Sequence, residues 1–275
     1  MFRSEILKAA SLTSTRVVFG VGVLGLLATQ ILLVTLLPAL ASGALRPQGE
    51  NLGSELPGVD LSSGSFQYSA LSVFGDGGSS GSLGLAVLGA LALGLLVATT
   101  DYRFGGIVGT ALAEPRRLRI LLDKVAATGV FAALLGVVYA VISVVVVVGT
   151  VQLSPAARLR VSGLDILSTS ARGVVAVVLL SLLGLGVGLL VRSQLAGFLT
   201  LGAIVVGEPL VQGMAGLLAG GAPGWTQLLP VTLSHAIVRS FSASGTNPGV
   251  ALLVLGVEVA AVLAAAGVAL RRRDL

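Results

Sequence analysis

The chain has 275 residues, of which 55% are hydrophobic and only 11% are charged, and its mean hydropathy is +1.02. A soluble domain carries ~25% charged residues, so this composition excludes an ordinary soluble enzyme and predicts a single transmembrane domain over residues 1–275. The absence of Cys excludes disulfides, thiolate metal sites and cysteine catalysis. The net charge of +5 comes from basic residues beside apolar segments, which predicts contact with membrane lipid and no nucleic-acid partner.

Six apolar runs are long enough to cross a bilayer, because a helix needs ~20 apolar residues to span the hydrocarbon. They are too long and too continuously apolar for the alternating strands of a β-barrel. The predicted fold class is therefore an all-α membrane protein with six transmembrane helices. The predicted spans are residues 17–41, 82–100, 125–153, 171–191, 195–220 and 248–270.

The N-terminal segment, residues 1–16, is mildly amphipathic and predicts an interfacial helix. Phe2, Ile6 and Ala9 fall on one face, and Lys8 lies on another. A polar leader that supplies only topology charges is the alternative. The first span also ends in a cleavage-like Ala39–Ala41 sequence, but its apolar run exceeds the 7–15 residues usual for a secretory signal.

The predicted outer loop, residues 42–81, is rich in Gly and Ser and carries scattered acidic residues. This composition favours a spacer, although Phe66, Tyr68 and Phe74 also suit a cap over a transport pathway. A second outer stretch, residues 221–247, is too long for a tight turn and too polar for a span. It predicts a short re-entrant or interfacial helix with Trp225 as an interface anchor.

The predicted inner loop, residues 101–124, combines charges, glycines and a helix start. Glu114-Pro115 begins a helix, and apolar residues then follow at helical spacing into the third span. We expect a coupling helix here, a lever on which a cytoplasmic partner pushes. The alternative is a basic loop that only holds topology.

Basic residues set the orientation, because Lys and Arg concentrate on the cytoplasmic side. With the N-terminus inside, the inner side receives twelve of the 17 basic residues and the outer side five. This predicts cytoplasmic N- and C-termini. Arg158, Arg160 and Arg172 oppose the assignment locally.

Glu208 and Glu258 lie near the middle of the fifth and sixth spans, where a charged residue costs ~2.5–3.5 kcal/mol on insertion scales. Each carboxyl is expected to be protonated, hydrogen-bonded inside the bundle or exposed to a wet cavity. Pro209 predicts a break that widens the fifth span. Glu208, Pro209 and Glu258 are therefore substrate-pathway candidates, with a purely structural role as the alternative.

No residue pattern supports catalysis. His235 is the only His and has no clustered ligands, so no metal site is expected, and no Ser, His and Asp arrangement for hydrolysis is visible. The phosphate-binding motif Gly-Lys-Ser/Thr is absent. The chain is predicted not to be an enzyme, to hold no cofactor, and to leave any ATP and Mg²⁺ to a partner subunit.

Several motifs occur in an order that resembles ABC-2-type ABC transporter permeases. The inner loop reads Thr100-Asp101-Tyr102-Arg103, then Gly109-Thr110, Pro115-Arg116 and Lys124. The similar order continues with Leu189–Ser193, Glu208-Pro209 and the terminal Arg272–Leu275. Asp101 departs from the commoner Glu of that family.

The resemblance implies a half-transporter of the bacterial plasma membrane that pairs with a second permease subunit and a cytoplasmic ATP-binding cassette subunit. Residues 1–16 correspond to the connecting helix, and the cargo is not implied. The residues that the resemblance assigns to coupling with the ATPase are Asp101, Arg103, Gly109, Thr110, Glu114, Pro115, Arg116 and Arg119.

Two other functions stay open from the residues alone. A proton-coupled secondary transporter would use Glu208 and Glu258 as carriers, although the halves lack matched broken spans. A non-transporting membrane scaffold or an intramembrane enzyme is the other possibility, without a catalytic pair to support the enzyme.

Overall fold

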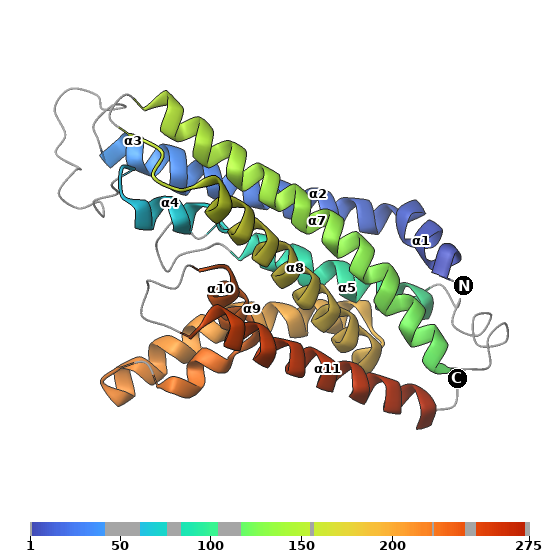
Figure 1. Cartoon of the computed structure of the whole chain (residues 1–275). Helices are drawn as coiled ribbons and strands as arrows, with labels where there is room; N and C mark the ends of the chain where they lie inside the picture. The colour runs from blue at the N-terminus through green and yellow to red at the C-terminus, as the bar shows by residue number, and fades with distance from the viewer. Residues whose placement is uncertain are drawn as a thin grey trace.

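The computed structural model describes residues 2–41, 61–75, 84–103, 117–154, 157–221, 223–239 and 246–272, and every regular element within these ranges is helical. The elements are α1 (Phe2–Ser11), α2 (Thr13–Gln30), the π-helix η1 (Ile31–Leu36), α3 (Leu37–Ala41), α4 (Gly64–Ala70), α5 (Leu85–Arg103), α7 (Arg117–Leu153), α8 (Gly163–Val191), α9 (Gln194–Ala219), the 3₁₀-helix η3 (Gly224–Leu228), α10 (Pro230–Val238) and α11 (Pro248–Arg272). Figure 1 shows them as one elongated bundle.

Six helical segments are long and apolar enough to cross a membrane, which confirms the predicted fold class. The third and fourth begin earlier than predicted, at Leu118 and Gly163 in place of residues 125 and 171. The prediction counted only apolar residues. At the fourth span, Ser162 and Asp165 form a capping box that starts the helix two turns before the apolar run.

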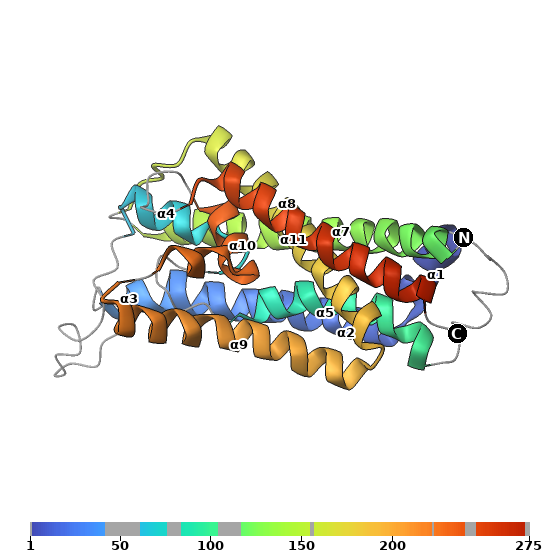
Figure 2. The same ribbon diagram turned by 90° about the horizontal axis from the view of Figure 1, so that it is seen from below.

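The α5 helix forms the centre of the bundle. It packs against α2, α7, α8 and α9, and 83% of its most apolar window is buried, against 22% for α9 and for α11. Figure 2 shows α9 and α11 on the outside of the bundle. Because their exposed side chains are mainly apolar, these outer helices face lipid.

Glycines bring α5 and α8 into close contact. A Cβ on Gly94 would overlap the carbonyl oxygen of Ser181, and one on Gly184 would overlap that of Leu91. Gly188 likewise faces Leu95, so the Gly184/Gly188 spacing serves helix packing. The similarly spaced Gly216 and Gly220 face open space among the described residues.

The segment 61–75 is part of the core, so the spacer interpretation is wrong for these residues. Val73 and Phe74 are 0% and 1% exposed, and Phe74 meets His235 of α10 edge to face with ring centroids 5.1 Å apart. Gln30 donates to the carbonyl oxygens of Ala70 and Ser72 at 3.0 and 3.2 Å. The Gly- and Ser-rich composition concealed these few anchoring residues.

The predicted re-entrant helix is α10. Glu208 lies 11 residues before the end of α9, yet it bonds the first turn of α10. At 1.5 Å per residue the chain has therefore turned back by about 16 Å into the bundle. The exposed Trp225 of η3 lies on this returning segment and suits an interface anchor.

The two ends of the bundle differ in charge. We call the end that carries α1, the end of α5, the start of α7 and the end of α11 the basic end (Figures 1 and 2). Among the described residues, the basic end carries Lys8, Arg103, Arg119, Lys124, Arg192, Arg271 and Arg272. The opposite end carries Arg158, Arg160, Arg172 and Arg239. By the preference of basic residues for the cytoplasmic side, the basic end is predicted to face the cytoplasm.

Candidate functional site

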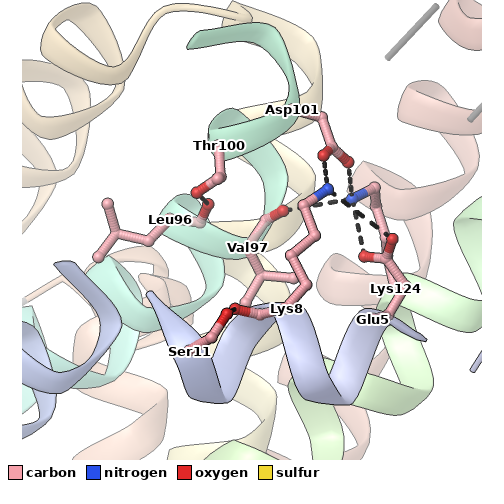
Figure 3. A network of polar contacts seen from close by, with 8 residues as sticks. All are labelled: Glu5, Lys8, Ser11, Leu96, Val97, Thr100, Asp101 and Lys124. Carbon is pink, nitrogen blue, oxygen red and sulfur yellow. Dashed lines mark hydrogen bonds and ion pairs between the residues drawn. The ribbon is translucent and has the colours of Figure 1, made fainter. Parts of the chain in front are cut away.

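Four charged side chains from three helices meet near the basic end, and we call them the ion cluster. They are Glu5 and Lys8 of α1, Asp101 in the last turn of α5, and Lys124 in the third turn of α7 (Figure 3). One oxygen of the Asp101 carboxylate contacts the Lys8 ammonium, and the other contacts Lys124. The Lys124 ammonium also reaches a Glu5 oxygen at 3.1 Å and the Val97 carbonyl oxygen at 3.4 Å.

Local sequence explains why these groups meet. Glu5 and Lys8 are three residues apart on α1, so they project from the same helical face. Ala9 follows on that helix, is 3% exposed and joins a small apolar cluster with Val97 and Leu121. The apolar contact holds α1 against α5 and α7, and the charged groups lie beside it.

Burial makes the pairing in the ion cluster necessary. Asp101 and Lys124 are each 1% exposed, and an isolated charge at such a position costs several kcal/mol of solvation free energy. Two carboxylates and two ammonium groups make the cluster neutral overall. Partial burial and the neighbouring Lys124 ammonium lower the pKa of Lys8, and the Glu5 carboxylate opposes that effect.

The ion cluster lies at both ends of the predicted coupling loop. Asp101 lies three residues before the segment 104–116, in the last turn of α5, and Lys124 follows the segment on a helix that begins at Arg117. Their contact therefore closes the base of the loop, and Lys8 and Glu5 attach α1 to the same point. The ion cluster therefore links α1, α5 and α7 at positions on both sides of residues 104–116.

Of the other predicted coupling residues, the structure describes Arg103 and Arg119, and neither is one of the four members of the ion cluster. Arg103 points to the start of α9, where its Nη1 donates to the Gln194 side-chain oxygen at 2.9 Å, and Arg119 is exposed on α7. Gly109, Thr110, Glu114, Pro115 and Arg116 lie outside the described residues. The predicted helix that continues into the third span is present from Arg117 onward as α7.

Glu208 is hydrogen-bonded inside the bundle, one of the three expected environments. Its Oε1 accepts from the Val231 N–H at 3.0 Å, and its Oε2 accepts from the N–H and the hydroxyl of Thr232 at 3.1 and 3.2 Å. These are donors of the first turn of α10, which has no intrahelical acceptors for them. Glu208 thus caps a helix that follows it by more than 20 residues.

Pro209 and Glu258 differ from Glu208 in their surroundings. The predicted break at Pro209 is wrong, because α9 runs through this residue from Gln194 to Ala219. The Glu258 side chain is partly buried on α11, and its Oε2 makes no hydrogen bond within the described part of the chain. A substrate-pathway role for Glu258 stays a prediction.

Sequence reasoning missed Glu5, Lys8 and Lys124 as site residues. The sequence does contain a signal for them, because Lys8 and Lys124 are the only lysines among its 17 basic residues and the other 15 are Arg. An ammonium group is compact, so two of them fit on one carboxylate, whereas the larger planar guanidinium prefers a two-pronged contact of its own. The choice of Lys at only these two positions is consistent with this geometry.

The chain matches no protein-family model, and no curated protein matches it. The resemblance to ABC-2-type permeases therefore rests on the order of short motifs. The fold establishes a protein with multiple membrane-spanning helices, and a more specific function is a matter of proposal.

Proposed function

We propose that this chain is the permease subunit of an ATP-driven exporter of the ABC-2 type, with ATP and Mg²⁺ bound by a separate cytoplasmic subunit. The observation that carries the proposal is the ion cluster, which joins α1 to both flanks of the loop at Asp101 and Lys124. A permease without a nucleotide site must receive motion from its partner, and a loop fixed rigidly at its base serves that purpose.

The proposed mechanism couples ATP binding in the partner to movement of the bundle. Closure of two ATPase subunits displaces the segment 104–116, and the ion cluster passes the displacement to α1, α5 and α7. Since α5 contacts α2, α8 and α9 through the centre of the bundle, its motion rearranges the spans around it. A second permease subunit supplies the other half of the pathway, and the proposed location is a bacterial plasma membrane.

The decisive experiment measures coupling to an ATPase. The chain is co-expressed with candidate ATP-binding cassette subunits, purified in mild detergent and reconstituted, and ATP hydrolysis is compared with that of the ATPase alone. We expect co-purification and a changed hydrolysis rate. Arg116→Glu should remove the change while membrane insertion persists, whereas Arg158→Glu at the opposite end should preserve it.

Two results would contradict the proposal. One is full transport activity of the isolated chain in vesicles without ATP, which is what a proton-coupled transporter predicts. The structure gives that alternative less support, because both oxygens of Glu208 are engaged by α10. The other is unchanged coupling in the Arg116→Glu variant, which would remove the lever role from the loop.

A further inference from the structure

A pocket of 560 Å³ opens at the basic end, between the last turn of α5 and the turn that joins α8 to α9. It lies apart from the ion cluster, which α5 presents to α1 and α7. Two arginines line it, and none of its lining residues is acidic. The lining residues are Thr99, Tyr102, Arg103, Arg192, Ser193, Gln194, Leu195 and Phe198.

Arg192 has an unusual backbone conformation. Its φ of 58° is in the left-handed region, and among the described residues it is the one non-glycine residue with a positive φ. A side chain at this position costs conformational free energy that glycine would avoid. Strained backbone positions cluster at functional sites, and Arg192 is a strained residue that lines this pocket.

The Arg192 guanidinium has unused hydrogen-bonding capacity. Its carbon lies 5.5 Å from the centroid of the Tyr102 ring, so the ring orients the cation. Its Nε and Nη2 are buried and make no hydrogen bond to any part of the chain that the structure describes, and the same holds for the Tyr102 hydroxyl. Buried donors without acceptors are costly, and an anion would supply the acceptors.

Arg103 brings a second positive charge to the pocket. Its Nη1 donates to the Gln194 side-chain oxygen at 2.9 Å, which holds the guanidinium against the first turn of α9. The N-terminus of α9 adds partial positive charge and first-turn N–H groups.

The pocket is also amphiphilic. Leu195 and Phe198 line it from α9 and are 72% and 36% exposed, so an apolar surface adjoins the arginines. The polar lining lies at the ends of spanning helices, where lipid headgroups are located. Basic pockets between transmembrane helices on the cytoplasmic side are typical headgroup sites.

We propose that this pocket binds the phosphate of an anionic membrane phospholipid. Arg192 and Arg103 contact the phosphate oxygens, the Tyr102 hydroxyl donates a further hydrogen bond, and the first acyl carbons lie on Leu195 and Phe198. A free phosphate ion shares the polar chemistry but leaves the apolar surface unused, so the lipid is the occupant that fits the whole pocket.

The test uses the full-length protein, purified in detergent and depleted of lipid. Native mass spectrometry follows the binding of dioleoyl phosphatidylglycerol, with dioleoyl phosphatidylcholine and inorganic phosphate as separate arms. We expect one high-affinity phosphatidylglycerol that neither of the other ligands displaces at equal concentration. Phosphatidylglycerol should also raise the midpoint of thermal unfolding.

Arg192→Gly is the informative variant, because glycine relieves the left-handed backbone while removing the guanidinium. Without lipid it should unfold at the same temperature as the wild type or higher, and its affinity for the first phosphatidylglycerol should fall about tenfold or more. Arg103→Gln should weaken the same binding event. Arg271→Gln, an exposed arginine at the same end, controls for general electrostatic attraction and should change affinity less than about twofold.

Equal phosphatidylglycerol binding by the wild type and Arg192→Gly would overturn the proposed site. Displacement of the lipid by inorganic phosphate at equal concentration would overturn the lipid assignment and identify the free ion as the occupant.

Discussion

Asp101 is the residue on which the basic end depends. Its side chain is 1% exposed, and its carboxylate contacts the ammonium groups of Lys8 and Lys124. The charge of Asp101 therefore decides whether the ion cluster is neutral. Its neighbours in the sequence indicate a charged loop, and nothing in the local pattern distinguishes a solvated aspartate from a buried one. Asp101 contacts Lys8 and Lys124, Glu5 contacts Lys124, and only the packing of three helices brings these residues together.

Asp101→Asn leaves the ion cluster with one uncompensated positive charge. Because removal of one partner from a buried ion pair leaves a desolvated charge, we expect the variant to lose about 3–5 kcal/mol of stability. Thermal or denaturant unfolding in detergent measures this. Arg271→Gln, which removes an exposed charge at the same end, should stay within about 0.5 kcal/mol of the wild type.

A second substitution tests whether charge balance is the cause. Asp101→Asn combined with Lys124→Met leaves only the Glu5 and Lys8 pair, which is neutral. The double variant should be less destabilised than the sum of the two single variants. Simple additivity would show that the two groups contribute separately and that the cluster is not a unit.

At the scale of single helices, the sequence predicted the spans well and the connections poorly. The six spans follow from long apolar runs, a signal that lipid as a solvent makes dominant. The start of α8 depended on a polar capping box, and the burial of residues 61–75 depended on Val73 and Phe74 within a Gly- and Ser-rich stretch. In both places a few specific contacts outweigh composition.

The capping of α10 by Glu208 is another contact whose partners the sequence alone did not identify. A mid-span glutamate signals that something in the membrane must satisfy it, and this part of the prediction is confirmed by its three hydrogen bonds. The donors belong to α10, for which the sequence predicted a re-entrant or interfacial helix without indicating that it meets Glu208. A transport role for Glu208 stays a prediction.

Glu208→Ala should release α10 from α9. The substitution leaves the buried Val231 N–H without its acceptor, and we expect a loss of about 1–3 kcal/mol. Hydrogen–deuterium exchange of residues 230–238 should become faster. Glu208→Gln keeps one oxygen acceptor and should exchange at an intermediate rate, and unchanged exchange in the alanine variant would contradict the capping role.

For the whole molecule, the distribution of charge between the two ends predicts the orientation. Because the chain contains no Cys, single cysteines can be introduced and read without interference. Ser11 is exposed at the basic end and Ser168 at the opposite end, which makes them matched positions. In intact bacterial cells, a membrane-impermeant maleimide should label Ser168→Cys and leave Ser11→Cys unlabelled.

Permeabilised cells provide the control for accessibility, since both cysteines should then react. Labelling of Ser11→Cys in intact cells would place the basic end outside. In that orientation the predicted coupling loop would lie outside the cell, where the proposed cytoplasmic ATPase could not contact it.

The length of α7 has a mechanical consequence. Its 37 residues extend about 55 Å, whereas the hydrocarbon layer is about 30 Å thick. The helix contains no proline, so it behaves as a stiff rod that projects beyond the lipid. If such a rod pivots near its middle by about 10°, each tip sweeps roughly 5 Å in opposite directions, since each arm is about 28 Å long. Lys124 lies about 17 Å from that pivot and Leu153 about 27 Å, so a push on Lys124 becomes a larger, reversed displacement at Leu153 on the far surface.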